Sequence, residues 1–187
     1  MEYKNQSLNK YLDDLSAKLS APGGGSAAAL NAAMGASLMS MVINFTLGKP
    51  KYLAFEPELK EILVKSEKLR NDFLELVDLD ILAYASKDMR KALDVSLMLA
   101  RLCCEAVKLC PPLVKKSNFN LISDVAIGVV FLESAFTGAC FNVQINLKSL
   151  ADIKLTQAVI KELNQMKKIV FKIRKNTEDS VGKIIRG

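Results

Sequence analysis

Apolar residues recur along the chain at steps of three and four positions, the spacing of one face of an α-helix. Six stretches carry this spacing, at about residues 8–19, 26–47, 57–89, 94–109, 123–147 and 152–185. Apolar and polar residues alternate nowhere over a useful length, so no strand is predicted. The pattern therefore predicts an all-α fold, a single-domain bundle of about six helices over residues 1–187.

Residues that favour helix ends support these boundaries. Ser7, Ser26 and Asp94 are of the types that accept hydrogen bonds from the first free N–H groups of a helix. Pro57 suits a first helical turn, and Pro111-Pro112 interrupts the helix before it.

Two of the predicted helices are unusually poor in charge. Residues 20–48 carry no charge and are long enough to span a bilayer. They are rich in Ala, Gly, Ser and Met and poor in Leu and Ile, which weakens membrane insertion. We therefore expect burial within protein and no membrane partner. Since helices 26–47 and 123–147 look too apolar for the surface of a small monomer, we also expect a homodimer.

Composition excludes several kinds of chemistry. The 187 residues include no histidine, which excludes His-based acid–base catalysis and His metal ligands. The four cysteines lack C-x-x-C spacing, so no zinc site is predicted, and we expect reduced thiols that fill the core. Neither a metal nor a cofactor is expected. The polar N-terminus lacks the apolar region of a signal peptide, which predicts a cytoplasmic protein.

The C-terminal helix is basic, in a chain of formal net charge +6. Nucleic-acid binding is one interpretation, and the solvated face of a packed helix is the other. Phe171 is the one aromatic residue among these charges, so we favour the solvated face and expect no nucleic-acid partner.

Asp80 is the strongest candidate for chemistry. On a helical wheel it falls on the apolar face of helix 57–89, with Phe73 and Val77, whereas Asp78 falls on the solvent side. Burial raises the pKa of a carboxyl towards neutrality, where an acid–base catalyst works best. The alternative, a structural aspartate paired with a neighbouring helix, fits the wheel equally well.

The glycine-rich turn before helix 26–47 is a candidate binding element. Residues Gly23, Gly24, Gly25 and Ser26 bring free N–H groups to a helix N-terminus, which suits an anion or a polar heterocycle. A flexible turn explains the same residues. At the opposite end of that helix, Lys49 and Lys51 could hold a carboxylate or simply favour the helix C-terminus.

Helix 123–147 carries Asp124, Asn142 and Asn146 on one face, with small residues between them. Asp124 lies about 27 Å from Asn142 along the axis, so one small ligand cannot contact all three on one helix. An elongated ligand or two subunits could. Hydrogen bonding between helices explains the asparagine pair at least as well as ligand binding does.

Together these motifs resemble the formiminotransferase-cyclodeaminase family, in family order over about residues 7–153. The matching stretches are Ala21-Pro22-Gly23-Gly24-Gly25-Ser26, Met34-Gly35-Ala36, Thr46-Leu47-Gly48-Lys49, Val77-Asp78-Leu79-Asp80 with Ala83-Tyr84, Asn118 with Ser123-Asp124, and Phe141-Asn142-Val143 with Ile145-Asn146-Leu147.

The resemblance implies an all-helical dimer that acts on a tetrahydrofolate derivative. It implies formimidoyltetrahydrofolate cyclodeaminase activity or, as the close alternative, methenyltetrahydrofolate cyclohydrolase activity. Asp80 matches the catalytic aspartate of the family. The residues expected at the substrate are Gly23, Gly24, Gly25, Ser26, Lys49, Lys51, Tyr84, Asn118, Asp124, Asn142 and Asn146.

The sequence departs from the family between Tyr84 and Asp94. Family members carry a longer segment there, with a Leu-Pro-Lys element, whereas residues 85–93 form a short connection in this chain. A non-catalytic helical dimer that binds folate or another small anion is therefore a further hypothesis.

Overall fold

A computed structural model describes residues 2–187, and these residues contain no strand. The helices are α1 (Leu8–Ser16), α2 (Gly24–Asn44), α3 (Glu56–Ala85), α4 (Met89–Val107), α5 (Cys110–Lys116), α6 (Ile122–Leu150) and α7 (Ile153–Arg186), with 3₁₀ turns η1 (Tyr3–Asn5), η2 (Pro50–Phe55) and η3 (Phe119–Leu121). The predicted all-α fold is confirmed. The helix that the sequence analysis omitted is α5, which starts at the two prolines because proline is tolerated in a first helical turn.

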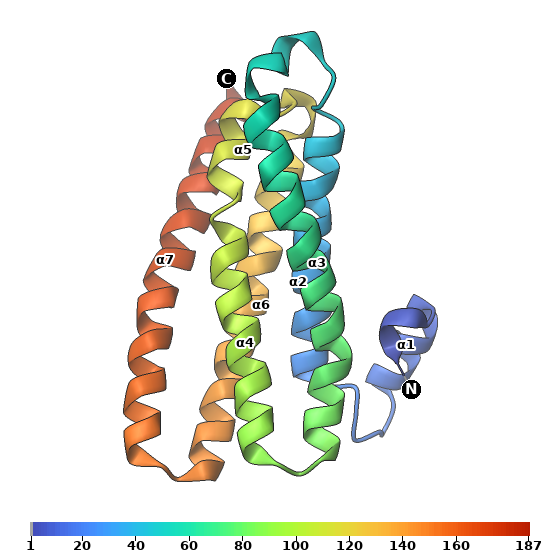
Figure 1. The fold of residues 1–187 in the computed structure, drawn as a ribbon, viewed down its shortest axis with the longest axis vertical. Helices are drawn as coiled ribbons and strands as arrows, with labels where there is room; N and C mark the ends of the chain where they lie inside the picture. Colours follow the sequence, from blue (N-terminus) through green and yellow to red (C-terminus); the bar gives the residue numbers. More distant parts are fainter. Residues whose placement is uncertain (1) are drawn as a thin grey trace.

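The long helices run side by side along the molecule, and α1 stands beside the bundle (Figure 1). Helix α2 packs between α3 and α6. It approaches α6 closely because both helices have a glycine at the crossing: a Cβ on Gly35 would lie 3.0 Å from the Gly128 carbonyl oxygen. The core around this crossing includes the fully buried side chains of Met39, Phe73 and Phe136.

Two helical stretches, Gly24–Asn44 and Phe119–Leu150, are long and apolar enough to cross a membrane by length and composition. In the bundle 61% of the α2 stretch and 39% of the second stretch are buried. Helix α2 is thus largely covered by its neighbours, and α6 leaves more of its apolar surface open.

The helix starts differ from prediction at two places. Ser7 accepts the Lys10 N–H at 3.2 Å, as predicted for an N-cap. Helix α2, however, begins at Gly24 rather than after Ser26. Asp94 is wrong as a cap, because α4 begins five residues earlier and Asp88 accepts the first N–H groups.

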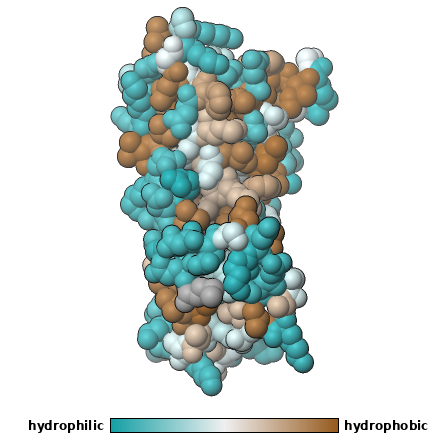
Figure 2. Space-filling view, turned by 90° about the vertical axis from the view of Figure 1, so that its right-hand side faces the viewer, coloured by the Kyte–Doolittle hydropathy of each residue, from teal (hydrophilic) through white to brown (hydrophobic). Residues whose placement is uncertain are grey.

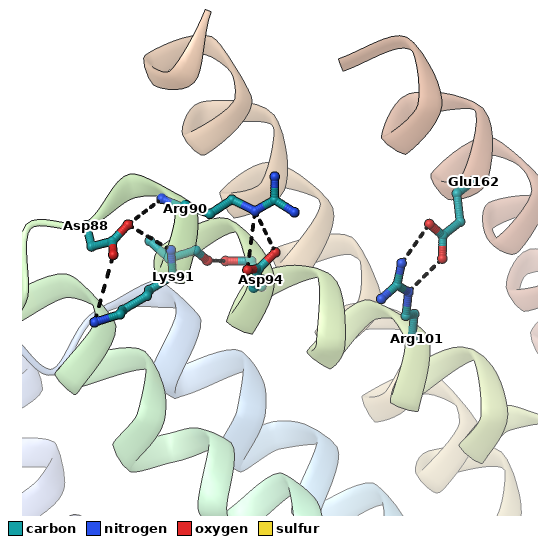
Figure 3. Close-up of polar contacts among 8 residues, drawn as sticks. Asp88, Arg90, Lys91, Asp94, Arg101 and Glu162 are labelled. Carbon is teal, nitrogen blue, oxygen red and sulfur yellow. Dashed lines mark hydrogen bonds and ion pairs between the residues drawn. The ribbon is translucent and has the colours of Figure 1, made fainter. Parts of the chain in front are cut away.

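The cysteines are free thiols, as expected. Cys103, Cys104 and Cys110 are buried in the core, and Cys140 is half-buried. Burial raises the pKa of the Cys110 thiol to about 12, which makes it unreactive. Helices α4 and α7 are joined by a two-bond ion pair between Arg101 and Glu162, at 2.6 and 2.9 Å (Figure 3).

Candidate functional site

A cavity of about 450 Å³ lies at the end of the bundle where α2 begins. This volume falls within the range of small-molecule sites. The described residues that line it come from the glycine turn, α3, α4 and α6, and are Ser20, Ala21, Gly23, Gly24, Gly25, Asp80, Ile81, Tyr84, Met89, Ala92, Ser96, Asn142, Ile145, Asn146 and Ser149. Asp80 is the only charged residue among them.

The Asp80 carboxylate lies against the N-terminus of α2. Its Oδ2 accepts the backbone N–H of Ser26 at 2.9 Å, one of the N–H groups that a helix leaves free in its first turn. Gly25 makes this approach possible, because a Cβ at that position would lie 2.1 Å from Asp80 Oδ1. The glycine turn therefore brings a helix N-terminus into contact with a carboxylate from α3.

Two opposing effects set the proton affinity of Asp80. Burial in the cavity wall disfavours the charged form and raises the pKa of the carboxyl, whereas the hydrogen bond from Ser26 lowers it. Burial is the larger effect, so the pKa of Asp80 lies above its ordinary value. The group is thereby tuned in the direction that general acid–base catalysis needs.

The prediction that Asp78 faces solvent is wrong. The side chain is buried, and its two carboxylate oxygens accept the backbone N–H groups of Tyr3 at 2.6 Å and Lys4 at 3.3 Å. The helical wheel correctly separates Asp78 from the Asp80 side of α3, but the N-terminal turn η1 covers the side on which Asp78 lies.

The asparagine pair predicted on α6 lies at the cavity with Asp80. Asn142 and Asn146 both line it, and Asn146 Nδ2 donates to the Ser96 hydroxyl of α4 at 3.4 Å. Tyr84 lines the same cavity with a largely exposed ring. These residues surround the space in front of the carboxylate with uncharged hydrogen-bonding groups.

The remaining predicted binding residues lie away from this cavity. Lys49, Lys51, Asn118 and Asp124 gather near the C-terminal end of α2, which is about 30 Å from its start. The Asn118 backbone N–H donates to Thr46 at 2.9 Å, which ties the turn before α6 to the end of α2. Within one chain one small ligand held at Asp80 therefore cannot also contact these four residues.

The turn between α3 and α4, which the sequence analysis found short, is followed directly by Met89 and Ala92 of the cavity lining. Figure 3 shows the polar contacts of this turn. Asp88 accepts the N–H groups of Arg90 and Lys91 at 3.0 and 3.2 Å, and Arg90 Nε pairs with Asp94 at 3.2 Å. The charges of this turn are thus largely paired with one another.

Sequence reasoning missed several lining residues. Ser96 and Met89 come from α4, where no local pattern distinguishes them from other helix residues. It also missed Tyr11, whose hydroxyl lies 3.1 Å from the Ser26 hydroxyl directly behind the site.

Comparison with known proteins places this geometry in a family. A sequence model of the family described as formiminotransferase-cyclodeaminase matches residues 7–87 and 84–165, and the two matched segments meet at the short α3–α4 turn. The methenyltetrahydrofolate cyclohydrolase of Methylorubrum extorquens is 34% identical over 182 residues, covering 85% of this chain and 88% of that protein.

Two cyclodeaminases are also similar. The formimidoyltransferase-cyclodeaminase of Rattus norvegicus is 29% identical over 169 residues, which cover 78% of this chain and 31% of that protein. A crystal structure of formiminotetrahydrofolate cyclodeaminase from Thermotoga maritima superimposes with a TM-score of 0.93 at 25% identity, covering 98% of this chain and 100% of that one. On the family match, the relatives and the shared fold, the chain belongs to the formiminotransferase-cyclodeaminase family.

Proposed function

We propose that the protein is a folate one-carbon enzyme that acts as a formimidoyltetrahydrofolate cyclodeaminase, with Asp80 as its general acid–base residue. The observation that carries the proposal is the position of Asp80. It is the only charged residue among those described at the cavity, its pKa is raised by burial, and it is held by the Ser26 N–H.

Cyclodeamination needs one group that both accepts and donates a proton. N10 of the substrate forms a bond to the formimidoyl carbon and loses its proton, and the amino nitrogen on that carbon gains a proton and leaves as ammonia. A carboxyl with a raised pKa can accept the first proton and donate the second. Its charge also stabilises the cationic methenyl centre that forms.

Methenyltetrahydrofolate cyclohydrolase activity is the second candidate. The cyclohydrolase of Methylorubrum extorquens supports it, because that relative matches this chain over 88% of its own length. In this reaction a water molecule attacks the same carbon, and Asp80 would act as its base. Both candidates use the same carboxylate and need no metal or redox cofactor.

A homodimer is part of the proposal. Helices α2 and α6 expose large apolar side chains, including Met34, Ile127, Phe141 and Ile145, and Phe45 directly after α2 is exposed as well. A two-fold dimer that pairs these helices antiparallel would bring Lys49 and Lys51 of one subunit towards the cavity of the other. Two cations there suit the negatively charged glutamate tail of a folate.

An absorbance assay of methenyltetrahydrofolate tests both activities. A cyclodeaminase forms this compound and ammonia from the formimidoyl substrate, whereas a cyclohydrolase consumes it faster than the uncatalysed rate. Turnover of neither substrate, together with measurable folate binding, would instead indicate a non-catalytic folate-binding dimer.

A further inference from the structure

The N-terminal segment, residues 2–16, lies beside the bundle rather than within it (Figure 1). Its residue Tyr11 contacts Ser26, next to the candidate site. The face that carries the segment mixes apolar and hydrophilic side chains (Figure 2). Within α1, Tyr11 is the buried residue, and Leu8 and Leu12 are exposed. The segment is therefore held by a few specific contacts and not by a continuous apolar face.

Two carboxylates on α3 anchor the start of this segment. Asp78 accepts the backbone N–H groups of Tyr3 and Lys4, and Lys4 Nζ pairs with Glu75 at 2.7 Å. The Tyr3 ring then packs edge-on against the Tyr11 ring, with centroids 5.6 Å apart. These contacts fix the position of Tyr11.

Tyr11 connects the segment to the carboxylate at the cavity. Its hydroxyl lies 3.1 Å from the Ser26 hydroxyl, and both side chains are buried. The backbone N–H of the same Ser26 donates to Asp80 at 2.9 Å. Tyr11 of the N-terminal segment thus contacts Ser26, and Ser26 in turn binds Asp80.

We propose that Tyr11 is a positioning residue for Asp80: its hydroxyl fixes Ser26, and the docked N-terminal segment keeps Tyr11 in place. The role of Asp80 in turnover rests on the proposed function, whereas the positioning of its carboxylate does not. Tyr11 is not among the residues that line the cavity, so it acts through Ser26 and not by contact with substrate.

Few other groups can influence the titration of Asp80. Around the cavity, α4 contributes Ser96, and α6 contributes Asn142 and Asn146, none of which titrates. Tyr84 on α3 is the only other titratable residue among the described lining residues. Burial raises the pKa of Tyr11 on α1, and Asp80 lies close enough that its charge helps to raise it further. Ser26→Ala, which removes the same contact and keeps the phenol, therefore separates the Tyr11–Ser26 contact from a direct effect of Tyr11.

Tyr11→Phe in the full chain removes the hydroxyl and keeps the ring. Without it Ser26 is less firmly held and its N–H bond to Asp80 weakens, so the pKa of Asp80 should rise by about 0.5–1 unit. NMR titration of protein labelled with ¹³C at the aspartate carboxyl measures this shift directly. In turnover, kcat should fall about tenfold with KM nearly unchanged, because the carboxylate is misplaced while the cavity is intact.

Tyr3→Phe is the matched control, since it removes a hydroxyl from the same segment that bonds to Asp14 and not to Ser26. The control should leave the Asp80 titration at its wild-type position. An unshifted titration in Tyr11→Phe, or an equal shift in Tyr3→Phe, overturns the proposal.

Ser26→Ala provides a second test if Tyr11→Phe does not fold. It removes the hydroxyl that Tyr11 contacts and should shift the Asp80 titration in the same direction, whereas an unchanged titration overturns the proposal. Absence of turnover in the wild-type protein with both folate substrates would count against the proposed function alone, because the titration needs no substrate.

Discussion

Gly25→Ala should inactivate the protein without unfolding it. Gly25 lies in the first turn of α2 with no positive φ, so alanine suits its backbone conformation. The added Cβ would lie 2.1 Å from Asp80 Oδ1 and 2.5 Å from Asp80 Cγ. Ordinary van der Waals contact begins at 3.4 Å, so the carboxylate must move by roughly 1 Å.

That displacement sets the expected size of both effects. A misplacement of about 1 Å at a reacting group can lower the rate about 100-fold. Overpacking lowers the free energy of unfolding by about 1–3 kcal/mol, whereas replacing glycine by alanine in a helix raises it by about 1 kcal/mol. The net loss should be no more than about 2 kcal/mol, which lowers the Tm of a domain of this size by at most about 8 °C.

Steady-state turnover of the folate substrates measures the loss of activity, and thermal unfolding measures the loss of stability. Gly24→Ala is the neighbouring control, because a Cβ there meets no atom within 4 Å. Because Gly24 itself lines the cavity, this control is assessed by the Asp80 titration, which should stay at its wild-type position, and by the Tm, which should not fall. Near wild-type turnover in Gly25→Ala, with an unchanged Asp80 titration, would show that the contact between Gly25 and Asp80 does not control the chemistry.

Three further predictions follow from the same contacts. Asp78→Asn should release the N-terminal segment and lower the free energy of unfolding by about 1–3 kcal/mol; hydrogen exchange of residues 3–16 measures the release, and unchanged exchange would argue against the anchor. Folding raises the pKa of Asp80, so the folded protein holds this proton more tightly than the unfolded chain does. The stability of the wild type relative to Asp80→Asn should therefore decline as the pH rises from the unfolded pKa, about 4, through the folded pKa. A difference in Tm between the two proteins that stays constant with pH would contradict this. If Lys49 and Lys51 complete the cavity of the other subunit, mixing Asp80→Asn with a Lys49→Glu/Lys51→Glu variant should restore activity. About half of the dimers are then mixed and each has one complete site, so the mixture should reach about a quarter of wild-type turnover. No recovery in confirmed mixed dimers would exclude the shared site.

Much of the fold could be predicted because helical periodicity is a local property. The apolar spacing predicts six of the seven α-helices found in residues 2–187, and the wheel places Asp80 on the side of α3 that faces the glycine turn and the cavity. Pro111 and Pro112 made α5 hard to predict, because proline commonly ends one helix and is equally suited to the first turn of the next. Asp94 has the residue type of an N-cap, but Asp88 has the same side chain and lies directly before the first turn of α4.

The misjudged parts of the site depend on contacts between distant segments. The wheel could not show that Asp78 is covered, because the covering residues lie about 75 positions away in the chain. The sequence predicts a free backbone N–H at Ser26, but it does not show that this N–H donates to Asp80, which lies 54 positions away in the chain. The sequence predicts Lys49 and Lys51 at the opposite end of the helix from the glycine turn. That Asp80 lies at the glycine-turn end, far from both lysines, is evident only from the packing of α3 against α2.

The most direct test of the central proposal is the rate of methenyltetrahydrofolate formation from formimidoyltetrahydrofolate by wild type and Asp80→Asn. The asparagine keeps the shape of the side chain and removes its proton-transfer capacity. We expect wild-type turnover with release of ammonia, and a rate at least about 100-fold lower in a folded Asp80→Asn protein. Wild-type turnover that persists in Asp80→Asn would contradict the proposed role of Asp80.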